Sequence, residues 1–196
     1  MQRRGRYHRR TLETQVAVEV NLDGEGRYQV RTGIGMLDHL LEQLARHALF
    51  DLVVEASGDL EREAHHLVED VGLALGHALD EALGERRGIV RFGHALVPMD
   101  DALALVAVDL GGRPWAHVKV AFRREMLGSL PTELIGHVLE AMARGGRLNL
   151  HVRLLSGEND HHRAEAVFKA LALALRQATR HEPRLGGEVP TTKGSL

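Results

Sequence analysis

The chain has 196 residues, of which 44% are hydrophobic, with a formal net charge of −2 and no cysteine. The balanced charge argues against nucleic acid or a membrane surface as a partner, the longest apolar runs fall short of the ~20 residues of a transmembrane helix, and disulfides are excluded. This length suits one compact domain or two small halves with a shared core, and we expect a cytoplasmic protein.

The first half of the chain predicts the order strand, strand, helix, strand, helix. Alternating apolar residues indicate the strands, apolar residues at helical spacing indicate the helices, and turn-forming residues fill 21–26. The predicted elements are strands at 14–20 and 28–31, a helix at 36–47, a strand at 50–56 and a helix at 65–79.

The second half repeats this order, after a further strand predicted at 89–97 near the junction. Its elements are strands at 102–110 and 115–122, a helix from 131 to 143, a strand at 148–155 and a helix at 161–175. Thr132 is a candidate N-cap of the first of these helices, and Asn159 or Asp160 of the second. We therefore divide the chain into repeats at 1–90 and 91–182, followed by an irregular tail at 183–196. Two α+β halves of this kind most simply pair their sheets or stack their helix layers.

Two predicted helices carry related sequences, HHLVEDVGLALGHAL from residue 65 and HHRAEAVFKALALAL from residue 161. Both copies keep an apolar stripe at helical spacing, and both keep two adjacent histidines and a glutamate at the helix start. Packing alone would preserve only the stripe. Because histidine and glutamate are metal-ligand types, and the chain has 13 histidines, the repeat predicts a duplicated metal site.

Helical geometry suggests how the ligands are divided. Residues four apart share a helix face, so His65 with Glu69, and likewise His161 with Glu165, can bind one ion. The second histidine of each pair points about 100° away, which favours binding to another ion. A histidine also lies in the helix that precedes each motif. The predicted ligand set is His39, His65, His66, Glu69, His137, His161, His162 and Glu165.

Shared between two ions, this set offers three histidines and one glutamate to each, although the partition itself is a hypothesis. Four such ligands would complete a tetrahedral zinc site, whereas a six-coordinate ion such as Mn²⁺ would keep two positions for substrate or water. We favour the second alternative, because the duplicated site looks catalytic. The remaining histidines are interpreted as surface or structural residues, among them His8, His77, His94, His117, His151 and His181.

Motifs along almost the whole chain resemble those of the imidazoleglycerol-phosphate dehydratase family. In chain order they are TGIGMLDHLLEQLARHALFDL, HHLVEDVGLALG, RFG, PMDDALA, DLGGRPW, GENDHHRAEAVFKALA and VPTTKG. The sequence departs from the family pattern at Thr192, where serine is usual, at Asp101, where glutamate is usual, and at Ala64, where an acidic residue is common. None of these changes removes a predicted ligand.

The resemblance implies a tandem repeat of ferredoxin-like α+β units, related to the second domain of ribosomal protein S5. It also implies a 24-subunit octahedral shell with two Mn²⁺ per active site at subunit contacts, and the same eight metal ligands. The catalytic residues it implies are Glu13, His39, Glu69 and Glu165. The implied substrate and phosphate contacts are Glu13, His47, Arg91, Arg113, Thr191, Thr192 and Lys193, with the tail closing on the substrate.

The implied reaction is loss of water from imidazoleglycerol phosphate, giving imidazole acetol phosphate in histidine biosynthesis. We expect the substrate ring to bind as imidazolate, so that it can expel the hydroxyl group through a diazafulvene-like intermediate. Glu13 or a released metal ligand would move the protons. The alternatives are a dinuclear metallohydrolase acting on another small phosphorylated substrate, and metal storage in a helical bundle, which the predicted strands disfavour.

Overall fold

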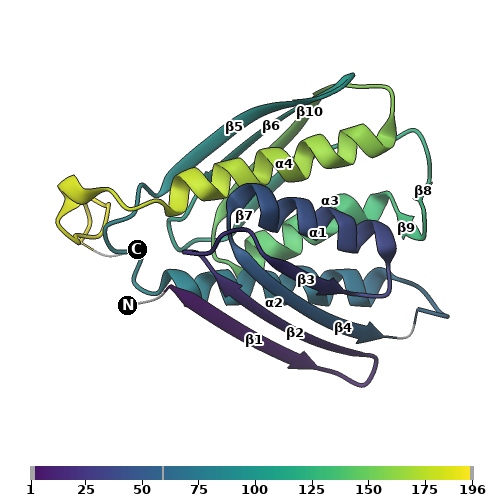
Figure 1. Ribbon diagram of the computed structural model, residues 1–196, viewed down its shortest axis with the longest axis horizontal. Coiled ribbons are helices and arrows are strands. Elements are labelled where there is room, and N and C mark those ends of the chain that lie inside the picture. Colours follow the sequence, from purple (N-terminus) through teal and green to yellow (C-terminus); the bar gives the residue numbers. More distant parts are fainter. Residues whose placement is uncertain (1–2, 59, 195–196) are drawn as a thin grey trace.

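The computed structural model describes residues 3–58 and 60–194, so residues 1–2, 59 and 195–196 of the predicted repeats and tail lie outside this description. Two four-stranded sheets enclose four helices, with α1 and α2 against one sheet and α3 and α4 against the other (Figure 1). The first unit comprises β1 (Arg4–Arg10), β2 (Thr14–Asn21), β3 (Tyr28–Arg31), α1 (Gly35–Ala48), β4 (Asp51–Gly58) and α2 (His65–Leu83). The second comprises β5 (Phe92–Met99), β6 (Ala102–Asp109), β7 (Trp115–Lys119), β8 (Met126–Leu127), β9 (Leu130–Pro131), α3 (Glu133–Gly145), β10 (Asn149–Ser156) and α4 (Asp160–Thr179), before a 3₁₀ turn at Pro183–Leu185.

The two sheets have the same topology. Their strand orders are β1-β2-β4-β3 and β5-β6-β10-β7. In each sheet the first three strands in this order are antiparallel, and the last strand runs parallel to its neighbour. The strands that lie over the helices alternate buried and less buried residues, as in β6, so each sheet turns one apolar face inward. The predicted α+β repeat of two similar units is confirmed.

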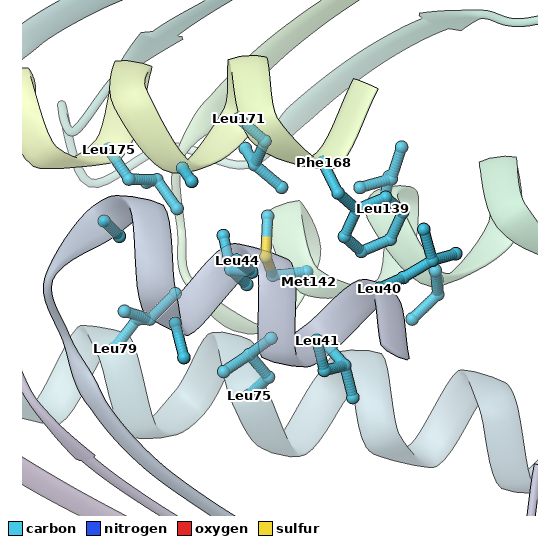
Figure 2. Close-up of a cluster of buried hydrophobic side chains, with 14 of the residues drawn as sticks. Leu40, Leu41, Leu44, Leu75, Leu79, Leu139, Met142, Phe168, Leu171 and Leu175 are labelled. Carbon is cyan, nitrogen blue, oxygen red and sulfur yellow. The ribbon is translucent and has the colours of Figure 1, made fainter. Parts of the chain in front are cut away.

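The helices of one unit pack against those of the other. Helix α1 lies against α4, and α2 lies against α3 (Figure 1). Leucines of all four helices, together with Met142 and Phe168, meet in one buried cluster between them (Figure 2). Full burial of each such side chain contributes about 1.5–3 kcal/mol, so neither unit keeps its core without the other. The packing of helix layer on helix layer was one of the two arrangements predicted.

Several element boundaries differ from the prediction. Strand β1 was missed because its sequence, RGRYHRR, is rich in arginine, and the face that it turns toward α2 carries Gly5, Tyr7 and Arg9, whose guanidinium pairs with Asp70. Strand β5 begins at Phe92 rather than at residue 89, because Val90 and Arg91 instead bond to the end of α4. Strand β7 stops at Lys119, and the short pair β8 and β9 was not predicted.

The two cap predictions had different outcomes. The Asn159 side chain accepts a hydrogen bond from the His161 amide at 2.9 Å, and this cap is confirmed. Thr132 does occupy the N-cap position of α3, but its side chain makes no capping hydrogen bond, because its hydroxyl donates to the Arg124 carbonyl at 2.7 Å. The tail is irregular after the 3₁₀ turn, as expected. Within the described ranges, none of the helices is long and apolar enough to cross a membrane.

Candidate active site

One candidate metal group joins the start of α4 to α1. His161 and Glu165 lie one turn apart on α4, and His39 faces them from α1. The Glu165 Oε1 atom is 2.6 Å from His39 Nε2 and 3.1 Å from His161 Nε2. One ligand atom from each residue lies within 4.8 Å of the others, which is close enough for one ion to contact all three.

The second group has the same composition and joins α2 to α3. His65 and Glu69 come from the first two turns of α2, and His137 comes from α3. The rings of His65 and His137 are 4.5 Å apart, and His137 Nε2 is 3.7 Å from Glu69 Oε1. Their ligand atoms also fall within 4.8 Å of one another. His137 Nε2 is buried and has no hydrogen-bond partner among the described residues, so it is an unused ligand atom aimed at the group.

The two groups form because helices of one unit pack against helices of the other. Each helix with the HHxxE motif supplies its first histidine and its glutamate, as predicted, whereas the third ligand comes from the opposite half of the chain. The sequence could not reveal that each group combines ligands from both halves, because this depends on which helices pack together. All four helices begin at the end of the molecule opposite the C-terminal tail, so both groups lie at that end (Figure 1).

The second histidine of each motif stands outside these groups and pairs with a carboxylate from a strand turn. His66 Nδ1 is 2.9 Å from Glu13, which follows β1. His162 Nδ1 is 2.6 Å from Asp101, which follows β5. The predicted sets of three histidines and one glutamate are therefore not assembled within one chain: each group holds two histidines and one glutamate.

Hydrogen bonds set the charge of two of these carboxyl groups. Burial alone would raise the pKa of Glu165, but the hydrogen bonds from Lys169 and His39 outweigh it and lower the pKa to about 2. The hydrogen bond from His162, with the backbone amides of Glu158 and Asn159, holds the pKa of Asp101 well below its usual range. Both groups are therefore carboxylates at neutral pH, which is the form that binds a cation.

The predicted phosphate contacts gather in one basic pocket of about 610 Å³. It is lined by Arg91, Arg113, Thr191, Thr192 and Lys193, among others. Arg91 is already engaged there, because its guanidinium forms two bonds to Asp109, at 2.7 and 3.1 Å, and donates to the Pro190 carbonyl at 2.8 Å. Its position thus ties the tail to the body of the protein.

The basic pocket lies far from both metal groups of the same chain. The Arg91 amide donates to the Ala178 carbonyl, in the last turn of α4, at 2.8 Å. His161 lies in the first turn of this 20-residue helix. At 1.5 Å per residue, the two ends are about 25 Å apart. One copy of the chain therefore does not bring the predicted metal ligands and the predicted phosphate contacts together.

His47, a predicted substrate contact, lies two turns beyond His39 on α1 and hydrogen-bonds Gln43 at 3.1 Å. Burial lowers its pKa, and the nearby charges of Lys169 and Arg46 lower it further, so it is neutral at pH 7. Glu13 lines a separate pocket of about 350 Å³ with His66. Sequence reasoning missed Lys169, although its position four residues after Glu165 is the spacing of a helical ion pair.

The donor atoms suit a divalent cation. Imidazole nitrogens and carboxylate oxygens without thiolate are typical ligands of Mn²⁺ and Zn²⁺. The unpartnered His137 nitrogen and the ionised carboxylate of Glu165 match this chemistry. Three ligands per group leave room for further ligands from outside the chain.

A family model, curated relatives and solved structures that resemble this chain all point to one family. The family model described as imidazoleglycerol-phosphate dehydratase matches residues 32–175. Proteins of that name from Chloroflexus aggregans and Zymomonas mobilis are 55% and 52% identical to this chain, over 99% and 100% of it and 95% and 100% of their own length. Solved structures of the enzyme from Pyrococcus furiosus and Staphylococcus aureus both superpose on this chain with a TM-score of 0.82. Their sequence identities are 40% and 33%. The matches cover 96% and 91% of this chain and 99% of each solved chain. The chain therefore belongs to the imidazoleglycerol-phosphate dehydratase family, and it is a hydro-lyase of histidine biosynthesis.

Proposed function

We propose that this chain dehydrates imidazoleglycerol phosphate at a site with two Mn²⁺ ions and binds the substrate ring as imidazolate. The observation that carries the proposal is the pair of matched groups, each with two histidines and one glutamate, at one end of the helix layer. When bound, the ions supply Lewis acidity, which makes deprotonation of the ring feasible near neutral pH. Two cations also suit a ring that has two nitrogen atoms.

The chain's own residues would hold the ions in place. His39, His161 and Glu165 would bind one ion, and His65, Glu69 and His137 the other. The carboxylates of Glu13 and Asp101 hold Nδ1 of His66 and His162. In this arrangement the carboxylate on Nδ1 fixes the tautomer of each ring and leaves Nε2 as the atom that could bind an ion. Nε2 of His162 lies 3.4 Å from Asp100 Oδ2, so an ion there would take the place of this contact.

We further propose that His66 and His162 complete the ligand set of a neighbouring copy, within a 24-subunit shell whose sites lie at subunit contacts. The separation of about 25 Å between the metal groups and the basic pocket supports this arrangement, because the substrate is too small to span it. A second copy would have to supply the cations that bind the phosphate. The cytoplasmic location remains a prediction from composition.

Within the basic pocket, Arg113 and Lys193 are the proposed phosphate ligands, beside the hydroxyls of Thr191 and Thr192. Arg91 would act chiefly by holding the tail through the Pro190 carbonyl. Glu13 is the proposed proton-transfer residue, because its carboxylate lies beside His66 at the edge of a pocket. An exposed carboxylate there can accept the proton lost from the substrate carbon.

The decisive experiment measures turnover of imidazoleglycerol phosphate by chelator-stripped protein, with and without added Mn²⁺. We expect no turnover without metal and full dehydration to the acetol phosphate after Mn²⁺ is restored. Undiminished turnover by protein that contains no metal would contradict the dimetal proposal. A folded, Mn²⁺-loaded protein that leaves this substrate unchanged would contradict the proposed reaction while keeping the metal site.

A further inference from the structure

The two metal groups are equal in ligands but not in surroundings. On α4, the Lys169 ammonium lies 2.6 Å from Glu165 Oε2, while Oε1 of the same carboxylate faces His39 and His161. In the aligned repeats, the position of Lys169 is occupied by Leu73 on α2. The His65–Glu69–His137 group therefore lacks the matching cation on its own helix.

The cationic side chains beside the two glutamates also differ in how exposed they are to solvent. Lys169 is 18% exposed, and its ammonium is held between Glu165 and the Met99 sulfur, 3.2 Å away. Glu69 is instead paired with Arg144, whose guanidinium nitrogen is 3.3 Å from Oε1 but whose side chain is 55% exposed. Arg144 can turn into solvent when a metal ion arrives, whereas Lys169 stays behind the carboxylate that would bind the ion.

From this difference we infer that the two metal sites are inequivalent: Lys169 weakens Mn²⁺ binding at the His39–His161–Glu165 site, so the His65–Glu69–His137 site fills first. The inference rests on the proposed metal function. A fixed positive charge repels a divalent ion and draws electron density from the shared carboxylate, and in a partly buried site this effect is weakly screened.

Lys169 also orients Glu165, which would favour metal binding. That contribution is the smaller one, because the Glu165 side chain is only 7% exposed and its contact with His39 already fixes Oε1. The repulsion, by contrast, acts on the full charge of the ion. We expect the two sites to differ in Mn²⁺ affinity by about tenfold or more.

A Mn²⁺ titration of the intact, assembled protein tests the inference, with free Mn²⁺ measured by its electron paramagnetic resonance signal. Wild-type protein should show a tight and a weak class of site. Lys169→Leu, which copies the first repeat, and Lys169→Gln, which keeps a polar side chain without the charge, should tighten the weak class about tenfold. The matched control Leu73→Lys should weaken the tight class, and His39→Ala should remove the weak one.

The outcomes separate this inference from the proposed function. Two equal classes in the wild type, or weaker Mn²⁺ binding in both Lys169 variants, would overturn the inequivalence and leave the dimetal site standing. Protein that binds no Mn²⁺ at all would overturn the dimetal proposal and the inference with it.

Discussion

At the scale of single residues, Asp51 shows how one carboxylate that belongs to neither candidate metal group fixes a turn. It begins β4, and its Oδ1 accepts hydrogen bonds from the amides of Glu25 and Arg27 at 2.9 and 3.1 Å. Burial would raise the pKa of Asp51, but these amides outweigh it and lower the pKa below 3.8. Folding therefore favours the ionised form.

The pH dependence of stability follows from this shift. Because the folded pKa is depressed, the stabilisation is complete above the unfolded pKa of about 3.9 and is lost as the pH falls through the folded value. We expect Asp51→Ala to lower the free energy of unfolding by about 1–3 kcal/mol at pH 7, since two amides lose their acceptor. Thermal unfolding at several pH values checks this: the gap between variant and wild type should shrink only below about pH 4. A gap that disappears already at pH 6 would contradict the assignment.

At the scale of elements, two glycines let the first strand of each sheet touch a helix. A Cβ atom on Gly5 would lie 1.9 Å from the Ala78 carbonyl oxygen of α2, and one on Gly93 would lie 1.9 Å from the Ala174 carbonyl oxygen of α4. Both obstacles are backbone atoms, which cannot turn aside as a flexible side chain can. The close strand–helix contact is thus duplicated along with the fold.

Gly93→Ala should force β5 away from α4 and lower the free energy of unfolding by about 2–3 kcal/mol, because overpacking against backbone is relieved only by moving an element. For a chain of this size the melting temperature should fall by roughly 4–12 °C. Gly35→Ala is the matched control, since its Cβ would meet no atom within 4 Å and alanine favours the helix that begins there. Equal melting temperatures for the two variants would refute the packing argument.

The elements also show what the sequence could and could not predict. The helix at 65–79 and the strand at 102–110 were predicted because their apolar spacing is regular, and both exist within a few residues of the predicted bounds. Strand β1 was missed because its stability comes from pairing with β2 and from Gly5, not from apolar alternation. The pairing of His39 with Glu165 depends on tertiary packing, which no local pattern encodes.

At the scale of the whole molecule, the packing of helices from one half against helices of the other gives the chain two candidate metal groups and one shared core. Since α1 packs on α4 and α2 on α3, unfolding of either half removes ligands from both groups. Metal binding at the proposed sites would therefore be coupled to the folding of the entire chain, and we expect bound Mn²⁺ to stabilise the folded protein as a whole.

The distance between the metal groups and the basic pocket leads to a test by complementation. His161→Ala removes a proposed metal ligand, and Lys193→Ala removes a cation of the basic pocket, beyond the opposite end of α4. Each variant alone should be nearly inactive. If every active site combines metal ligands of one copy with Lys193 of another, random co-assembly of the two variants should restore roughly a quarter of the wild-type sites.

Turnover by doubly tagged, co-expressed protein measures this, and Lys193→Ala co-expressed with Lys193→Met is the control that should stay inactive. Mixed assemblies without any gain in turnover would show that the metal ligands and Lys193 of an active site come from the same copy.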